Sequence, residues 1–546
     1  MKRFLLLAIV IFVFSCTQQP TADTVVYGKI WTGNPQQPWA EAMAIGGDTI
    51  LAVGSVDEIK AFEGKQTQKI EAPVGGLITP GFIDTHTHFV DGGFRLSSVQ
   101  LRDAKTPKEF IQRIKNYAAT IQPGEWITGG DWDHENWGGE LPSKDWIDSV
   151  TENNPVWINR LDGHMSLANS LALKVAGVDE KVKDVPGGTI VRTKSKLTGI
   201  FKDNAEVYVG RVVPVPTIQQ QDRALDTAMN YVASKGITSV HNMSGYMEAL
   251  KRASKQGRLK TRIYAGMALS EWKDLAKAIQ ENGRGDKWLK IGSLKGFVDG
   301  SLGSHTAAFF KPFADSPTDS GFMVIEENDL RKQIYSADSA GLHVMVHAIG
   351  DKAIHTLLNI YEDVAKQNGA RDRRFRIEHA QHLHPNDIPR LAKLNVIASM
   401  QPYHAIDDGR WAEKVLGYER CKTTYAFKSL MDAGTTVSFG SDWFVAPPTP
   451  LEGIYAAVTR RTLDDKNPNG WVPEQRISVE QALRAYTVNA AYASFEENSK
   501  GSLKPGMLAD FVVLDKDITT INLIEIKKIK VLRTIVGGTT VFLSRE

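Results

Sequence analysis

Two histidines, His86 and His88, have the spacing of a metal-binding pair. They end an apolar segment at residues 77–88. On a strand, residues two apart point to the same face, so both imidazoles could hold one ion from two directions. Such a pair also arises by chance in many proteins. Its chemistry therefore depends on what stands at comparable positions further along the chain.

Later apolar segments end in side chains that suit the same chemistry. These are His347, His379 and Asp442, and a further segment carries Lys295. Imidazoles and a carboxylate that converge on one place suit Zn²⁺ or a similar divalent ion. The ion would lower the pKa of a bound water toward about 7. Asp442 could then take the proton from that water and pass it to a leaving nitrogen.

Each of these residues also has an ordinary structural interpretation. His347 and His379 could be core histidines whose hydrogen bonds are satisfied, and Asp442 could cap a helix N-terminus. Lys295 could extend its ammonium group to solvent. Five metal-compatible residues and a lysine at successive segment ends are implausible as independent coincidences, so the joint pattern favours a metal site.

The segments that carry these residues predict the fold. Eight of them read as strands and alternate with amphipathic helical patterns, such as residues 333–340, 353–367 and 385–393. Eight strand–helix units predict an α/β fold, a (β/α)8 TIM-like barrel, whose functional residues lie at the C-terminal ends of the strands. The strand segments are residues 77–88, 236–242, 262–268, 289–299, 343–347, 375–379, 396–401 and 436–442.

The remaining chain predicts two additions to the barrel. The interval between the first two strand segments is far longer than a normal loop, which predicts an inserted subdomain at about residues 95–230. Strand-like segments near both chain ends predict a small β-sandwich built from both of them. The expected divisions are a leader and tether at 1–23, the sandwich at 24–76 and 501–546, and the barrel at 77–500.

Composition excludes several classes of function. The 65 basic and 63 acidic residues give a net charge of +2 over 546 residues, which argues against nucleic acid as an electrostatic partner. The two cysteines, Cys16 and Cys421, cannot form a disulfide framework or a cysteine-based zinc site. Cys421 is expected in the core.

The first 16 residues have the pattern of a secretory signal. A basic start is followed by an apolar run at residues 4–14 that is too short to span a membrane, and then by Ser15. Residues 13–16 resemble a bacterial lipoprotein lipobox, in which Cys16 is lipidated. An ordinary signal peptide with an incidental cysteine is the alternative. We expect a location in the bacterial cell envelope, either lipid-anchored or periplasmic, with membrane contact only through the anchor.

Short motifs run through the chain in a distinctive order. They are residues 77–88 (LITPGFIDTHTH), 162–164 (DGH), 169–170 (NS), 295–303 (KGFVDGSLG), 376–381 (RIEHAQ), 399–402 (SMQP), 440–442 (GSD), 482–487 (ALRAYT) and 506–510 (GMLAD). The series resembles the amidohydrolase superfamily, in the branch of YtcJ-like proteins and N-substituted formamide deformylases (amidohydrolase family 3). The resemblance runs from about Val25 to the C-terminus.

The resemblance implies roles for particular residues. Lys295 matches a lysine that CO₂ carboxylates in related enzymes, so that it bridges two ions; the alternative is an unmodified lysine that faces a substrate oxyanion beside one ion. His164 is expected to reach over the barrel mouth and polarise a carbonyl oxygen, with a local loop hydrogen bond as its alternative. One or two divalent ions, most often zinc, are implied between His86, His88, His347, His379 and Asp442.

Four further residues are candidates for substrate contact. Asp299 could orient Lys295 or bind substrate, or it could set a turn. Gln401 and His404 follow the seventh strand segment, where surface roles are the alternative. Trp132 could line a substrate pocket, although filling the core of the inserted subdomain is the default for such a residue.

Together these features predict a metal-dependent hydrolase that cleaves a non-peptide C–N bond in an N-acyl or N-formyl amine. The same site could serve a cyclic amidase, a deaminase or an isomerase. A non-enzymatic binding lipoprotein is disfavoured, because binding alone does not require all the metal-compatible residues. A small-molecule substrate is the expected partner, and a homodimer is a further expectation because barrels of this superfamily often pair.

Overall fold

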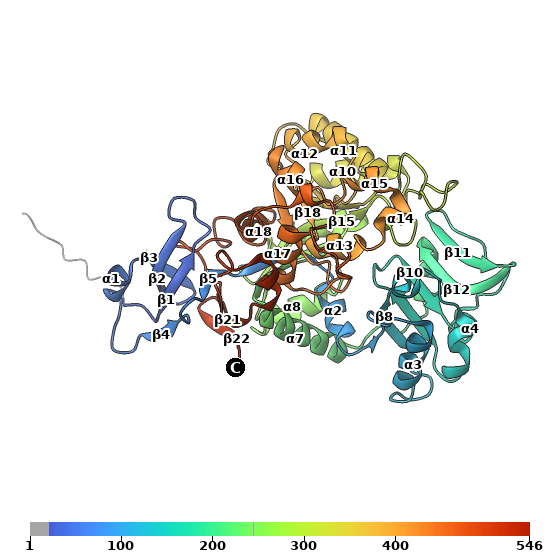
Figure 1. The fold of residues 1–546 in the computed structure, drawn as a ribbon, viewed down its shortest axis with the longest axis horizontal. Helices are drawn as coiled ribbons and strands as arrows, with labels where there is room; N and C mark the ends of the chain where they lie inside the picture. Colours follow the sequence, from blue (N-terminus) through green and yellow to red (C-terminus); the bar gives the residue numbers. More distant parts are fainter. Residues whose placement is uncertain (1–20, 244, 546) are drawn as a thin grey trace, which may run out of the picture.

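The computed structural model describes residues 21–243 and 245–545. The barrel occupies the centre of the molecule, with a β-sheet part on one side and the inserted part on the other (Figure 1). Cys16 and the lipobox lie outside the described residues. Within the described ranges, no helix is both long and apolar enough to cross a membrane.

The barrel is a sheet of eight parallel strands whose order in space follows their order in the chain. A parallel bridge between Thr87 and Trp443 brings the last strand region beside the first. This confirms the predicted (β/α)8 fold, and each of the eight predicted segments contributes a barrel strand. The strands are β6 (Phe82–Thr87), β13 (Ile237–Asn242), β14 (Arg262–Ala268), β15 (Leu289–Phe297), β16 (His343–Ala348), β17 (Arg376–His379), β18 (Ile397–Met400) and β19 (Val437–Phe439).

The first predicted strand segment is divided in the structure. Residues Leu77–Pro80 form β5, which belongs to the other large sheet, and the barrel begins only at β6. Gly81 stands at the division, where its N–H donates to Asp510 O over 2.9 Å. A Cβ at Gly81 would lie 2.2 Å from Thr238 Oγ1, so the close approach of β13 requires glycine there.

Amphipathic helices cover the outside of the barrel. In α11 (Asp351–Gln367) the buried residues include Ile354, Leu357, Leu358 and Tyr361, which recur at the three- and four-residue spacing of one helix face. The other main covering helices are α7 (Ile218–Ser234), α8 (Met247–Lys255), α9 (Trp272–Asn282), α10 (Glu327–Ser339), α12 (Ile388–Lys393), α16 (Phe427–Asp432) and α17 (Pro450–Thr459).

The inserted part has its own sheet, in the order β11-β12-β10-β9-β8-β7. Helix α7 packs against α2 (Phe89–Arg95), so residues 218–234 lie with the barrel although the sequence placed most of them in the insertion. The strands of the inserted sheet are β7 (Val99–Gln100), β8 (Ile127–Trp132), β9 (Val156–Arg160), β10 (Met165–Ala168), β11 (Gly188–Thr193) and β12 (Lys196–Asp203).

The third part is built from both chain ends, as the sequence predicts. Its strands join in one mixed sheet of order β22-β21-β20-β5-β1-β2-β3, with β4 paired to β1. A buried ion pair fastens this sheet to the barrel: Arg262 of β14 donates to both carboxylate oxygens of Asp510 over 2.6 and 2.8 Å. The sheet comprises β1 (Thr24–Trp31), β2 (Trp39–Gly46), β3 (Thr49–Gly54), β4 (Gln68–Glu71), β5, β20 (Phe511–Leu514), β21 (Val531–Val536) and β22 (Thr539–Leu543).

The Arg262–Asp510 pair should dominate the stability of this junction. Asp510→Asn leaves the Arg262 guanidinium buried without its counter-charge, so we expect the free energy of unfolding to fall by about 3–5 kcal/mol. Urea unfolding followed by circular dichroism measures the change. The matched control is Asp432→Asn in the exposed Lys428–Asp432 pair, which should cost less than about 1 kcal/mol. Equal effects of the two variants would contradict the role given to this pair.

Candidate functional site

The predicted site residues converge at the C-terminal ends of the barrel strands. A cavity of about 170 Å³ lies there, between the barrel and the loop that joins β9 to β10 of the inserted sheet. His86 is fully buried beside it. Its lining includes the predicted residues His88, His164, Lys295, His347, His379, His404 and Asp442.

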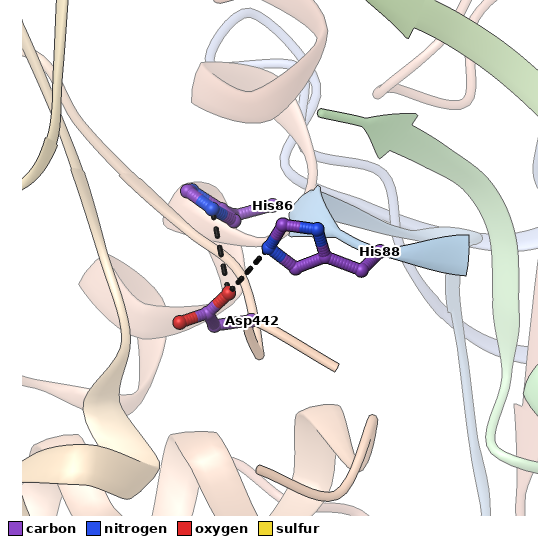
Figure 2. Close-up of side chains that lie close together, drawn as sticks. All are labelled: His86, His88 and Asp442. Atoms are coloured by element: carbon purple, nitrogen blue, oxygen red, sulfur yellow. Dashed lines mark ion pairs between the residues drawn. The ribbon is translucent and has the colours of Figure 1, made fainter. Parts of the chain in front are cut away.

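The Asp442 carboxylate faces two imidazoles. Its Oδ1 atom lies 3.4 Å from Nε2 of His86 and 3.4 Å from Nε2 of His88 (Figure 2). Although Asp442 is buried, this oxygen has no hydrogen-bond partner among the described residues. A buried carboxylate oxygen without a partner is costly, and a cation between it and the two nitrogens would remove that cost. The residues present therefore fit a divalent metal ion.

His86 is held in the form that a metal ligand requires. Its Nδ1 lies 2.5 Å from Glu378 Oε2, and Glu378 is itself fixed by a 2.7 Å bond from Arg376 Nε. An Nδ1–H that donates to Glu378 leaves the Nε2 lone pair directed at Asp442 and an ion. Burial, followed by the charge of Lys295, lowers the pKa of His86 well below its usual value, so the ring is neutral.

A second group of donors shares Asp442. The ligand atoms of His379, His404 and Asp442 lie within 4.8 Å of one another, as do those of His86, His88 and Asp442. His379 Nδ1 donates to Gln401 Oε1 over 2.8 Å, which leaves its other nitrogen for an ion. His404 Nε2 is buried without a hydrogen-bond partner among the described residues. The donor set is large enough for one ion or for two.

The backbone at two of these ligands adopts a rare conformation, and hydrogen bonds hold the loop around Asp442 in place. Asp442 and His379 have φ values of 62° and 73°, a region that non-glycine residues rarely adopt. Asp442 N donates to His86 O over 2.8 Å. Ser441 donates through its N–H and hydroxyl group to the two oxygens of Asp84 over 2.9 and 2.5 Å. These bonds tie the loop after β19 to strand β6, and so place Asp442 opposite the histidine pair.

Lys295 and His347 complete the inner wall of the cavity. Lys295 Nζ lies 3.2 Å from His86 Nε2, and burial lowers the pKa of this lysine to about 8 against the opposing charges of Glu378 and Asp442. His347 Nε2 lies 3.0 Å from Gly300 O, so its other nitrogen is the one available to a ligand. His347 belongs to neither of the two donor groups that share Asp442.

His164 carries a positive charge at the outer side of the cavity. Its Nδ1 lies 2.6 Å from Asp203 Oδ1. Burial alone would lower the pKa of His164, but the hydrogen bond and charge of Asp203, with Asp162 and Glu206, outweigh burial and raise it to about 9. The imidazolium is therefore available as a hydrogen-bond donor in the cavity at neutral pH. Its ring centroid lies 5.0 Å from that of His347.

Three predicted substrate contacts do not line this cavity. Trp132 is fully buried in the core of the insertion, where its Nε1 donates to Ile158 O over 3.0 Å. Asp299 accepts bonds from the backbone N–H groups of Ala308, Ile349 and Gly350, and so fastens two loops. Gln401 acts through His379. Trp132 has the core position of its default interpretation, whereas the bonds of Asp299 reach other loops and do not define a turn before Gly300.

Other lining residues were not predicted as site residues, although Asp162 and Phe297 lie within the motifs. They come from loops and short helices whose approach to the barrel mouth depends on the fold. Arg160, which bonds to Asp162 over 2.6 Å, stands two residues before Asp162 of the DGH motif and could have been found there. The principal additional residues are Arg160, Asp162, Phe297, Asp407, Asp408, Trp411 and Phe444.

Comparison with known protein families shows the family to which this chain belongs. The model of the family described as "Amidohydrolase family" matches residues 74–542. The chain belongs to the amidohydrolase family. This amidohydrolase is 39% identical over 94% of its length to Protein LONG AFTER FAR-RED 3 of Arabidopsis thaliana, of which 90% is covered. The resemblance found in the sequence motifs is thereby confirmed.

Two bacterial relatives match over almost their full lengths. The putative amidohydrolase YtcJ of Bacillus subtilis is 29% identical, over 94% of this chain and 98% of that protein. The N-substituted formamide deformylase of Arthrobacter pascens is 26% identical, over 94% and 97%. An uncharacterized metal-dependent hydrolase of Pyrococcus horikoshii superposes with a TM-score of 0.74 at 27% identity, over 92% and 99%. Family and donor set together support metal-dependent hydrolysis as the general activity.

Proposed function

We propose that this amidohydrolase cleaves a non-peptide C–N bond in an N-acyl or N-formyl amine. The observation that carries the proposal is the buried, unpartnered Asp442 Oδ1, which lies 3.4 Å from the Nε2 atoms of both His86 and His88. A divalent ion held there, which we propose to be Zn²⁺, would supply a nucleophile at neutral pH by lowering the pKa of a water ligand toward about 7. The name of the Arthrobacter pascens relative agrees with an N-formyl substrate.

Several side chains of the protein would each have a separate role in hydrolysis. Asp442 is placed to accept the proton of the attacking water and to return it to the leaving nitrogen. His164, as an imidazolium, donates a hydrogen bond to the carbonyl oxygen on which negative charge develops. Glu378 and Gln401 hold the Nδ1 atoms of His86 and His379, so that both rings keep their orientation.

We further propose that Lys295 is carboxylated and bridges two ions. Because burial lowers its pKa to about 8, part of the lysine is a neutral amine near pH 7 and can attack CO₂. The resulting carbamate would place a carboxylate beside His86 Nε2, which Lys295 Nζ already approaches to 3.2 Å. The alternative is an unmodified lysine that faces the substrate beside a single ion.

A product analysis separates this proposal from its alternatives. Holoprotein is incubated with N-formyl and N-acyl amines, cyclic amides and amino-substituted heterocycles. We expect release of an amine and a carboxylate from the first class. Ring opening alone would indicate a cyclic amidase, ammonia a deaminase, and rearrangement without cleavage an isomerase. Metal binding without turnover of any compound would favour the binding protein over the hydrolase.

We also propose a location in the bacterial cell envelope, through lipidation of Cys16 or release into the periplasm after cleavage of the leader. The basis is the sequence of residues 1–16, which lie outside the described residues. Incorporation of labelled palmitate in wild-type cells, lost in Cys16→Ser, distinguishes the two forms. The homodimer stays a prediction that light scattering of the purified protein tests.

A further inference from the structure

A second cavity lies directly beside the one that holds the metal donors. It is open to solvent and has a volume of about 750 Å³, against about 170 Å³ for the inner cavity. Its walls come from α2, from strands β8 and β9 of the insertion, and from residues 206–220. We name the smaller space the inner cavity and the larger one the outer cavity. Of the residues that line either space, Gly163 and Phe444 line both.

Phe444 forms the wall between the two spaces. On the inner side its ring centroid lies 5.6 Å from that of His88. On the outer side the Arg95 guanidinium lies 4.4 Å from the centre of the ring. The tip of the ring meets the loop of the insertion, because a Cβ built on Gly163 would lie 3.9 Å from Phe444 Cζ. The ring thus bridges from the barrel to the DGH loop.

The backbone of this wall is firmly held, so the ring is anchored. Arg102 Nη2 donates to Phe444 O over 2.6 Å and to Val445 O over 2.5 Å. Gly163, the other residue that lines both spaces, has no side chain, and its φ of 71° would strain a larger residue there. The Phe444 side chain is therefore the part of the wall that determines whether the two spaces are joined.

The volumes indicate what this wall does. The inner cavity has less than a quarter of the volume of the outer cavity, which suits a small acyl or alkyl group. Ligand sites commonly occupy about 300–1,000 Å³, so the inner cavity lies below that range and the outer cavity within it. We propose that Phe444 is a specificity-determining residue that confines the group next to His88 to a small size. The inference rests on the proposed function.

The test compares Phe444→Ala with wild type on two series of amides. One series lengthens the acyl group from formyl to hexanoyl, and the other lengthens the N-substituent from methyl to hexyl. In at least one series, we expect the kcat/KM ratio of the longest to the shortest member to rise about tenfold or more in Phe444→Ala, because the long group gains the outer cavity. An unchanged ratio in both series would overturn the proposal.

A matched control removes a ring without joining the cavities. Phe94 is a partly buried phenylalanine that lines only the outer cavity, so Phe94→Ala should keep the wild-type ratio. The same size dependence in Phe94→Ala and Phe444→Ala would also overturn the proposal. Melting curves show whether each variant folds. If Phe444→Ala does not fold, the comparison is made with Phe444→Leu, which replaces the ring with a shorter apolar side chain.

A binding measurement keeps this inference separate from the proposed function. Carboxylates from acetate to hexanoate are titrated into the holoprotein, and binding is followed by ligand-observed NMR, which requires no turnover. In Phe444→Ala, the binding of hexanoate should become stronger relative to that of acetate, even if no amide is hydrolysed. Failure of hydrolysis with this result would contradict the C–N bond proposal alone. The same relative affinities in both proteins would overturn the role of Phe444.

Discussion

Asp442→Asn should lower kcat/KM by about 10³-fold or more while the protein remains folded. Asparagine keeps an oxygen at the position that faces His86 and His88, but it cannot accept the proton of the attacking water or return it to the leaving nitrogen. Single-turnover and steady-state rates on the substrate identified by product analysis measure the loss. Because the proton transfer belongs to the chemical step, we expect the fall in kcat rather than in substrate affinity.

Two comparisons make the Asp442 result specific. Asp372→Asn removes a carboxylate from the opposite end of the barrel, where Asp372 pairs with Arg374, and should leave the rate unchanged. Metal analysis of Asp442→Asn separates loss of the proton acceptor from loss of an ion. A variant that retains its metal and keeps more than about a tenth of the wild-type rate would rule out Asp442 as the proton carrier.

The second large effect concerns His164. His164→Gln should lower kcat by about 10²- to 10³-fold with a smaller change in KM, because a charged donor to the developing oxyanion is lost. Glutamine keeps a neutral donor of similar reach, so the positive charge is the main property removed. The matched control is His355→Gln on the outer face of α11, which should retain wild-type kinetics.

His164 should also make kcat/KM depend on pH, and the direction of that dependence follows from the pKa of His164. The pKa of His164 is raised to about 9, so the imidazolium is present below that pH and is lost as the pH rises through it. Wild-type kcat/KM should therefore decline above about pH 9, and the decline should be absent from the residual activity of His164→Gln. An identical alkaline limb in both proteins would assign it to another group.

Much of the barrel could be predicted from the sequence because the signals of its strands are local. Each strand is a short apolar segment, and a ligand at its C-terminal end must approach the others once the sheet closes. Thus His86, His379 and Asp442 could be placed together from their positions alone. The division of residues 77–88 between two sheets depends on the contact of Gly81 with β13, which no local pattern reveals.

The rest of the site depends on contacts between distant segments. His404 belongs to helix α13 (Pro402–Asp408), not to a strand, so the strand-end argument could not identify it as a possible ligand. The charge of His164 depends on Asp203, which comes from a strand 39 residues later. The wall formed by Phe444 exists only because the DGH loop of the insertion meets the loop after β19.

The metal centre is tested most directly by the metal content of the wild-type chain, purified without added metal and analysed by elemental mass spectrometry. We expect about two Zn²⁺ per chain, and about one in Lys295→Ala, because the carbamate provides the bridge to the second ion. One ion in both proteins would contradict the carbamate and leave a mononuclear site. A wild-type chain that holds no metal and takes up none when Zn²⁺ is supplied would contradict the metal centre itself.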